Sequence, residues 1–128
     1  MTPVAPEPEY ACLFLPFPPT VNNLFVNNPR TRGRFPSRLY KAWREETARA
    51  LEKQRPLPSF AGPVRVTYSF GRPDRRRRDL ANYEKAASDA LVTAGVLADD
   101  CQIEHLTLRW DADVVGCRAE IEPLGATA

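Results

Sequence analysis

Residues 64–70 (VRVTYSF) alternate between apolar and polar side chains, with an apolar residue at every second position. This period of two predicts a half-buried strand, which Pro63 and Gly71 bound. The apolar run at residues 12–17 (CLFLPF) also has the length of a strand. Because proline cannot donate a backbone hydrogen bond, the prolines in and after this run restrict it to a sheet edge or a strand end.

Two more segments alternate near the end of the chain, at residues 106–110 and 115–121. Between them, residues 111–113 (DAD) are typical of a turn. The pattern predicts a closing hairpin in which these two strands pair with each other. Residues 21–33 (VNNLFVNNPRTRG) are instead rich in turn formers and predict a long loop, of the kind that often contacts ligands.

Two segments show the period of an amphipathic helix. The first begins after Ser37, a residue type that caps helix N-termini, and stops before Pro56. The second begins after Asp79, a possible cap of the same kind, and stops at Gly95. The apolar stripe of the first comprises Leu39, Tyr40, Trp43, Thr47, Ala50 and Leu51, and that of the second comprises Leu80, Tyr83, Ala87, Ala90, Leu91 and Ala94.

The elements follow the order β-α-β-α-β-β, which predicts an α/β (α+β) fold with a mixed sheet and two helices packed on it. A chain of 128 residues is long enough for one domain with a core and too short for two of usual size. We therefore expect a single domain at residues 11–124. Residues 1–10, rich in Pro and Glu, predict a flexible N-terminus.

The basic residues are more informative than the formal net charge of +2. Of the 18 basic residues only Lys41, Lys53 and Lys85 are lysines. Guanidinium groups bind phosphate bidentately, although a GC-rich genome also enriches arginine. The placement is more specific than the composition, since one cluster comprises Arg30, Arg32, Arg34 and Arg38 and another comprises Arg75, Arg76, Arg77 and Arg78.

The cysteines argue against a disulfide framework or a zinc site, because Cys12, Cys101 and Cys117 are odd in number and form no C-x-x-C pair. No apolar run approaches the roughly 20 residues that a membrane span needs. We expect a cytoplasmic protein with no membrane partner.

The second arginine cluster lies between the strand at residues 64–70 and a predicted helix, so both of its ends are held by core elements. Arginines held in this way are a usual means of binding phosphodiester backbones. Asp79 follows the cluster directly, and Asp99 and Asp100 follow the helix. Asp79 alone is explained by capping, but carboxylates beside a basic surface are also ligands for hard cations such as Mg²⁺ or Mn²⁺.

The string PDRRRRDLANYEKAASDALVTAGVLADDCQI, together with LPFPPTVNN near the start, resembles the RusA-type Holliday junction resolvases of bacteria and phages. The resemblance extends from about Leu13 to Ile121 and keeps the order RRRRDL, N, KA, DAL, G and DD. It implies a homodimeric endonuclease that binds four-way DNA junctions, uses Mg²⁺ or Mn²⁺, and cuts two strands symmetrically. That activity serves DNA recombination and repair.

The resemblance also implies roles for individual residues. Asp79 and Asp100 match metal-binding aspartates, Lys85 matches a lysine needed for cleavage, and Arg78 matches a basic residue beside the site. Asn82 and Asp99 lie within the same motif. The DNA-binding residues that we predict are Arg75, Arg76, Arg77, Arg78, Asn82, Arg30, Arg32 and Arg34.

One position departs from the family pattern. The family has aspartate at the second position after Asp79, and this chain has Ala81, whose methyl group cannot ligate a metal. Ala81 therefore stands in both the catalytic and the metal-binding set as a lost ligand, either substituted to trap bound DNA or lost naturally. An alternative function follows, a non-catalytic module that binds junctions or duplex DNA.

Overall fold

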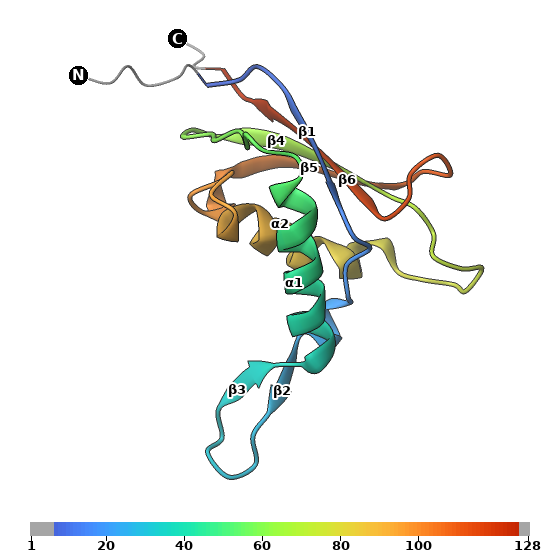
Figure 1. Ribbon diagram of the computed structural model, residues 1–128. Helices are drawn as coiled ribbons and strands as arrows, with labels where there is room; N and C mark the ends of the chain where they lie inside the picture. The colour runs from blue at the N-terminus through green and yellow to red at the C-terminus, as the bar shows by residue number, and fades with distance from the viewer. Residues whose placement is uncertain (1–6, 126–128) are drawn as a thin grey trace.

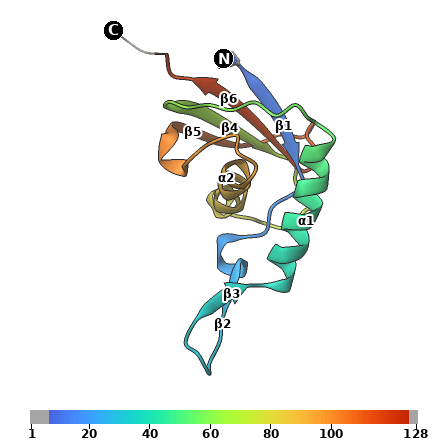
Figure 2. The ribbon, with the colours of Figure 1, turned by 60° about the vertical axis from the view of Figure 1, so that its left-hand side comes forward.

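A computed structural model describes residues 7–125 and places four strands in one mixed sheet (Figure 1). The strand order is β1-β6-β4-β5, in which β4 and β5 are parallel and the other pairs are antiparallel. Two α-helices lie on one side of this sheet (Figure 2). The bounds are β1 Ala11–Leu15, α1 Arg38–Glu52, β4 Val64–Phe70, α2 Glu84–Thr93, β5 Ile103–Trp110 and β6 Cys117–Pro123. The predicted α+β fold with a mixed sheet is confirmed.

Strand β4 forms the centre of the core, as its alternation predicts. Val64, Val66, Tyr68 and Phe70 are fully buried on the side of the helices. Strand β1 is an edge strand, which also agrees with the prolines that follow it.

Helix α1 begins where the sequence predicts it. The hydroxyl of Ser37 accepts a hydrogen bond from the backbone N–H of Tyr40 at 3.0 Å, so Ser37 is the N-cap. Tyr40 and Trp43 are buried as expected, but Leu39 is 57% exposed and does not belong to the buried stripe. Leu39 points to a different face of the helix from its buried neighbour Tyr40, since successive residues of a helix are turned by about 100°.

The predicted hairpin of the last two strands is wrong, because β4 lies between β5 and β6. Helix α2 carries the chain across from β4 to β5, which makes these two strands parallel neighbours. Residues 111–116 then cross the end of β4, and Val115 in this crossing is 94% exposed instead of starting a strand. Gly71 makes the crossing possible, since a Cβ there would lie 1.7 Å from the carbonyl oxygen of Val114.

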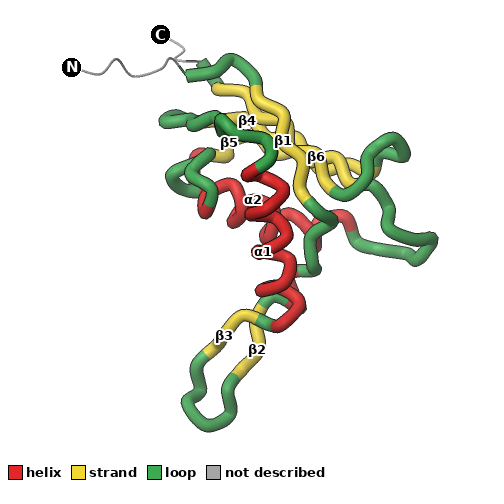
Figure 3. Tube along the Cα trace, in the orientation of Figure 1, coloured by secondary structure: helices red, strands yellow, loops and turns green. Residues whose placement is uncertain are grey.

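The predicted loop at residues 21–33 is also wrong in part. A 3-10 turn, η1, spans Val21–Asn23, and a small hairpin follows it, formed by β2 (Phe25–Asn27) and β3 (Arg34–Pro36). The turn formers at the centre of the segment make the hairpin loop. This hairpin projects from the N-terminal end of α1, away from the sheet (Figure 3).

The start of the second helix differs from the prediction as well. Asp79 precedes a 3-10 turn, η2 (Leu80–Tyr83), and its side chain makes no capping hydrogen bond. Helix α2 begins only at Glu84. Its end is as predicted, because Gly95 has a φ of 81°, a left-handed conformation that favours glycine.

The predicted flexible N-terminus, residues 1–10, lies in part outside the described residues. Within the described part, a carboxylate oxygen of Glu7 accepts a hydrogen bond from the backbone N–H of Ala61 at 2.9 Å. No helix in residues 7–125 is long and apolar enough to cross a membrane.

Candidate active site

The arginine run lies in the loop that connects β4 to η2, and the loop is held at its base. Asp74 and Arg78 form a clasp, with Arg78 Nη2 2.7 Å from Asp74 Oδ2 and Nε 3.3 Å from Oδ1. The same Oδ1 accepts the backbone N–H of Arg76 at 3.0 Å. These hydrogen bonds, that from Arg78 above all, hold the pKa of Asp74 below its usual range. The carboxylate therefore stays ionised and orders the loop.

Arg78 is more enclosed than its three neighbours. Its Nη1 donates to the hydroxyl of Tyr83 at 3.2 Å, and its guanidinium lies 5.9 Å from the ring centre of Phe17. Its side chain is 21% exposed, whereas that of Arg76 is 82% exposed. Arg75 and Arg77 are also exposed. The run thus divides into one arginine that anchors the loop and three that face solvent.

Arg76 and Arg77, together with Arg78, border a depression of about 390 Å³. Its lining also includes Asp79, Asn82 and Tyr83, so the predicted Arg76–Arg78, Asp79 and Asn82 are brought together. Because the carboxylate of Asp79 does not cap η2, it remains available in this depression. Ala81, two residues further, is exposed and offers only a methyl group.

A second group forms around Lys85 on α2. Its Nζ lies 3.1 Å from Asp89 Oδ1 and 3.9 Å from Asp100 Oδ2, so the predicted Lys85 and Asp100 are brought together. The hydrogen bond to Asp89 raises the pKa of Lys85 above its ordinary value. The ammonium group is therefore a stable cation placed between two carboxylates.

The two aspartates after α2 have different tasks. Asp99 caps the 3-10 turn η3 (Asp100–Gln102), with its carboxylate accepting the backbone N–H of Cys101 at 2.9 Å. The Gln102 side chain completes this capping box by accepting the backbone N–H of Asp99 at 3.1 Å. Asp100 takes no part in the cap and is exposed. Asp100 is thus the member of the pair whose carboxylate is not used by the cap and faces Lys85.

Among residues 7–125 no three His, Cys, Asp or Glu side chains are grouped so that they could hold a metal ion. Asp79 and Asp100 supply oxygen donors of the kind that Mg²⁺ and Mn²⁺ prefer. With Ala81 in the position between them in the motif, the described residues do not complete a metal centre within one chain.

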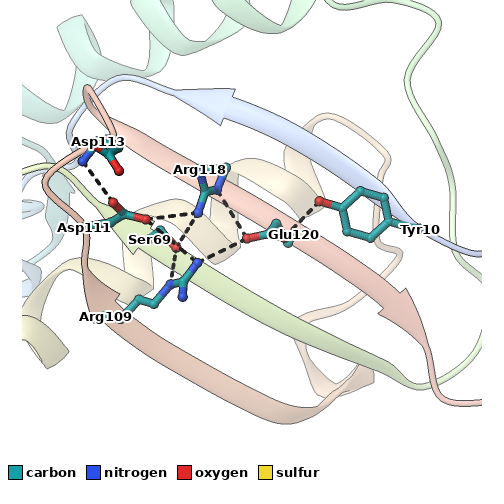
Figure 4. Close-up of polar contacts among 7 residues, drawn as sticks. All are labelled: Tyr10, Ser69, Arg109, Asp111, Asp113, Arg118 and Glu120. Atoms are coloured by element: carbon teal, nitrogen blue, oxygen red, sulfur yellow. Dashed lines mark hydrogen bonds and ion pairs between the residues drawn. The ribbon is translucent and has the colours of Figure 1, made fainter.

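On the sheet face opposite the helices, two arginines, Arg109 and Arg118, are paired with carboxylates and a hydroxyl (Figure 4). Arg109 Nε donates to the buried Ser69 hydroxyl at 2.7 Å, and Arg118 lies 3.2 Å from both Asp111 and Glu120. Each of these guanidiniums is neutralised by carboxylates. The exposed arginines of the loop after β4 are therefore the better candidates for phosphate contacts.

An arginine loop held by Asp74 beside the carboxylate of Asp79, followed along the chain by a lysine paired with carboxylates, is typical of domains that bind and hydrolyse phosphodiesters. Residues 16–122 match the profile of endodeoxyribonuclease RusA. Over 90 residues the chain is 41% identical to the crossover junction endodeoxyribonuclease RusA of Escherichia coli strain K12 and 40% identical to that of Enterobacteria phage 82. Each match covers 70% of this chain and 72% of the relative. The chain belongs to the RusA family of endodeoxyribonucleases.

Sequence reasoning missed two contributors to the site. Asp74 and Asp89 each lie four residues from a basic partner, Arg78 and Lys85, and that spacing is a signal available in the sequence. The aromatic packing of Phe17 against Tyr83, with ring centres 4.8 Å apart, had no such signal. It depends on a contact between distant parts of the chain.

Proposed function

We propose that this protein binds four-way DNA junctions and that it descends from an enzyme that cuts them symmetrically. One observation carries the proposal: a loop of four consecutive arginines is clasped by Asp74 so that three of them face solvent, and two of these, Arg76 and Arg77, border the same depression as Asp79. Three exposed guanidiniums on an ordered loop suit the phosphates of a DNA backbone. The names of the relatives, crossover junction endodeoxyribonucleases, indicate a branched substrate.

Within this proposal, Asp79 and Asp100 are the carboxylates that bind Mg²⁺ or Mn²⁺. A bound divalent ion makes a water more acidic and neutralises charge on the scissile phosphate. Lys85, kept protonated by Asp89, stabilises negative charge that develops on a phosphate oxygen. Arg75, Arg76 and Arg77 hold the flanking backbone.

Ala81 reduces cleavage more than binding in this proposal. A methyl group removes one anionic ligand, so the ion is bound weakly. It also removes a negative charge that would face the phosphates, which favours DNA binding. A second candidate function is a non-catalytic module that holds junctions without cutting them. Ala81 favours it, because Asp79 and Asp100 then lack a third metal ligand among the described residues.

We also propose that the protein acts as a homodimer, because two symmetrical cuts need two copies of the site. Sedimentation of the protein alone and bound to a junction measures this, with one junction per two chains expected.

The test of the main proposal is cleavage of a synthetic four-way junction with Mg²⁺, before and after Ala81→Asp. We expect both proteins to retard the junction in a gel, and Ala81→Asp to cut it much faster. Asn82→Asp is the control, since it adds a carboxylate at the neighbouring position of the motif and not at the position of the missing ligand. If neither protein binds the junction, the proposal fails. If Ala81→Asp binds but stays inert, the non-catalytic function is supported.

A further inference from the structure

The β2–β3 hairpin is the part of the described structure that projects furthest from the sheet and helices (Figures 1 and 3). It carries Arg30, Arg32 and Arg34, all exposed. Residues 10–44 contain no Asp or Glu at all. A cationic projection without a single carboxylate is electrostatically complementary to a polyanion.

The hairpin has an inner and an outer face. Phe25 packs edge-on against Tyr40 of α1, with ring centres 5.7 Å apart, and the Arg34 guanidinium lies 5.2 Å from the centre of the Phe25 ring. These side chains occupy the inner face, turned towards the body of the protein. Since successive residues of a strand point to opposite faces, Val26 and Phe35 occupy the outer face.

Val26 and Phe35 are cross-strand partners on that outer face. They are 40% and 44% exposed, so the pair forms a small apolar surface at the end of a ribbon. Arg30 and Arg32 lie beyond this surface, at the exposed tip of the hairpin. An apolar, partly aromatic patch beside guanidiniums matches a nucleobase face bordered by phosphates.

The root of the hairpin lies at the candidate site. The 3-10 turn η1, which precedes β2, contacts both η2 and α2, the segments that hold Asp79, Asn82 and Lys85. The root is also firmly tied, since Leu24 is buried and its carbonyl accepts the backbone N–H of Ser37 at 2.9 Å. DNA in the arginine-lined depression would extend past the base of a hairpin whose direction is fixed.

We infer that the β2–β3 hairpin contacts the branch point of the DNA, with Phe35 and Val26 stacked on a base face and Arg30 and Arg32 at the tip on the phosphates. Uninterrupted duplex presents stacked bases and offers no such face, whereas a branch point exposes one where the arms separate. The hairpin therefore provides preference for junctions over duplex. The inference rests on the proposed function and adds to it the element that recognises the branch.

The test compares the affinity of each variant for a fluorescent four-way junction and for a linear duplex of one arm, measured by anisotropy without divalent ions. Phe35→Ala is expected to weaken junction binding about tenfold, the loss of one base–aromatic stack. Its duplex binding stays unchanged. Phe35→Trp keeps the preference because it keeps an aromatic face. Phe14→Ala is the matched control, since Phe14 is 50% exposed on the opposite sheet face and has no predicted DNA contact.

The double variant Arg30→Gln, Arg32→Gln separates charge from stacking and is expected to weaken binding to both DNAs. The inference is overturned if Phe35→Ala keeps its junction affinity or loses duplex affinity equally. It is also overturned if Phe35→Ala changes the molecular mass in solution, because the hairpin would then contact a second copy of the chain. A wild-type protein without junction preference would overturn the proposed function itself.

Discussion

The salt dependence of junction binding is the most direct measure of the arginine loop. Each phosphate neutralised by a basic side chain contributes about 0.9 to the slope of log affinity against log salt concentration. Arg75, Arg76 and Arg77 are exposed, and the pairing of Arg76 with Asp74 at 3.4 Å leaves its side chain 82% exposed. Arg78 is paired with the same carboxylate at 2.7 Å and is only 21% exposed. The triple variant to Gln should therefore lower the slope by about 2.7. Four equivalent arginines would instead contribute about 3.6.

The assay is anisotropy of a labelled junction in salt from about 50 to 200 mM, the range over which counterion release is pronounced. Arg78→Gln tests the division within the run. It should lower affinity by loosening the loop, yet leave the slope nearly unchanged. Arg49→Gln on the exposed surface of α1 is the control and should change neither quantity. A triple variant whose slope falls by less than about one would refute the reasoning.

Two further predictions concern stability and protonation. Ser88→Ala leaves the hydroxyl of the fully buried Tyr68 without its partner at 2.8 Å and should cost about 1–3 kcal/mol in urea unfolding. Tyr68→Phe should cost only about 1 kcal/mol, because Ser88 keeps its bond to Glu84; equal losses would contradict this. Asp89→Asn should lower the pKa of Lys85 in an NMR titration, since the Asp89 hydrogen bond is the main cause of its raised value. The contribution of the Lys85–Asp89 pair to stability is full below the ordinary lysine pKa and is lost as the pH rises through the raised pKa. An unchanged pKa of Lys85 in Asp89→Asn would contradict this assignment.

Local patterns predicted those elements whose ends are marked by a single residue. Ser37 caps α1, Gly95 ends the turn after α2, and the alternation at residues 64–70 coincides with β4. In each case the signal and the structure it determines lie within a few residues. Such elements depend little on the rest of the fold.

Strand pairing was not predictable in the same way. Alternation shows that residues 106–110 lie in a sheet, but it carries no information on which strand is the neighbour. Both β5 and β6 pair with β4, and the chain reaches β6 by a crossing that Gly71 permits. The close approach at Gly71 involves residues more than forty positions away, which no local pattern contains.

The candidate site was predicted in its chemistry more than in its internal contacts. The motif placed Lys85 with Asp100, which lie 3.9 Å apart, and Arg76–Arg78 with Asp79 and Asn82. It did not distinguish Arg78 from its neighbours. That distinction comes from Asp74, whose clasp requires the loop to fold back on itself.

Ser37 joins two parts of the molecule that the sequence presents as separate. Its hydroxyl accepts from the first turn of α1 and donates to the carbonyl of Asn23 at 2.6 Å, while its backbone N–H is bonded to Leu24. The root of the hairpin and the first turn of α1 are thus held together through one residue, so a substitution of Ser37 would loosen both. The direction in which the hairpin projects is thus set by the start of the helix and not by the hairpin's own two short strands.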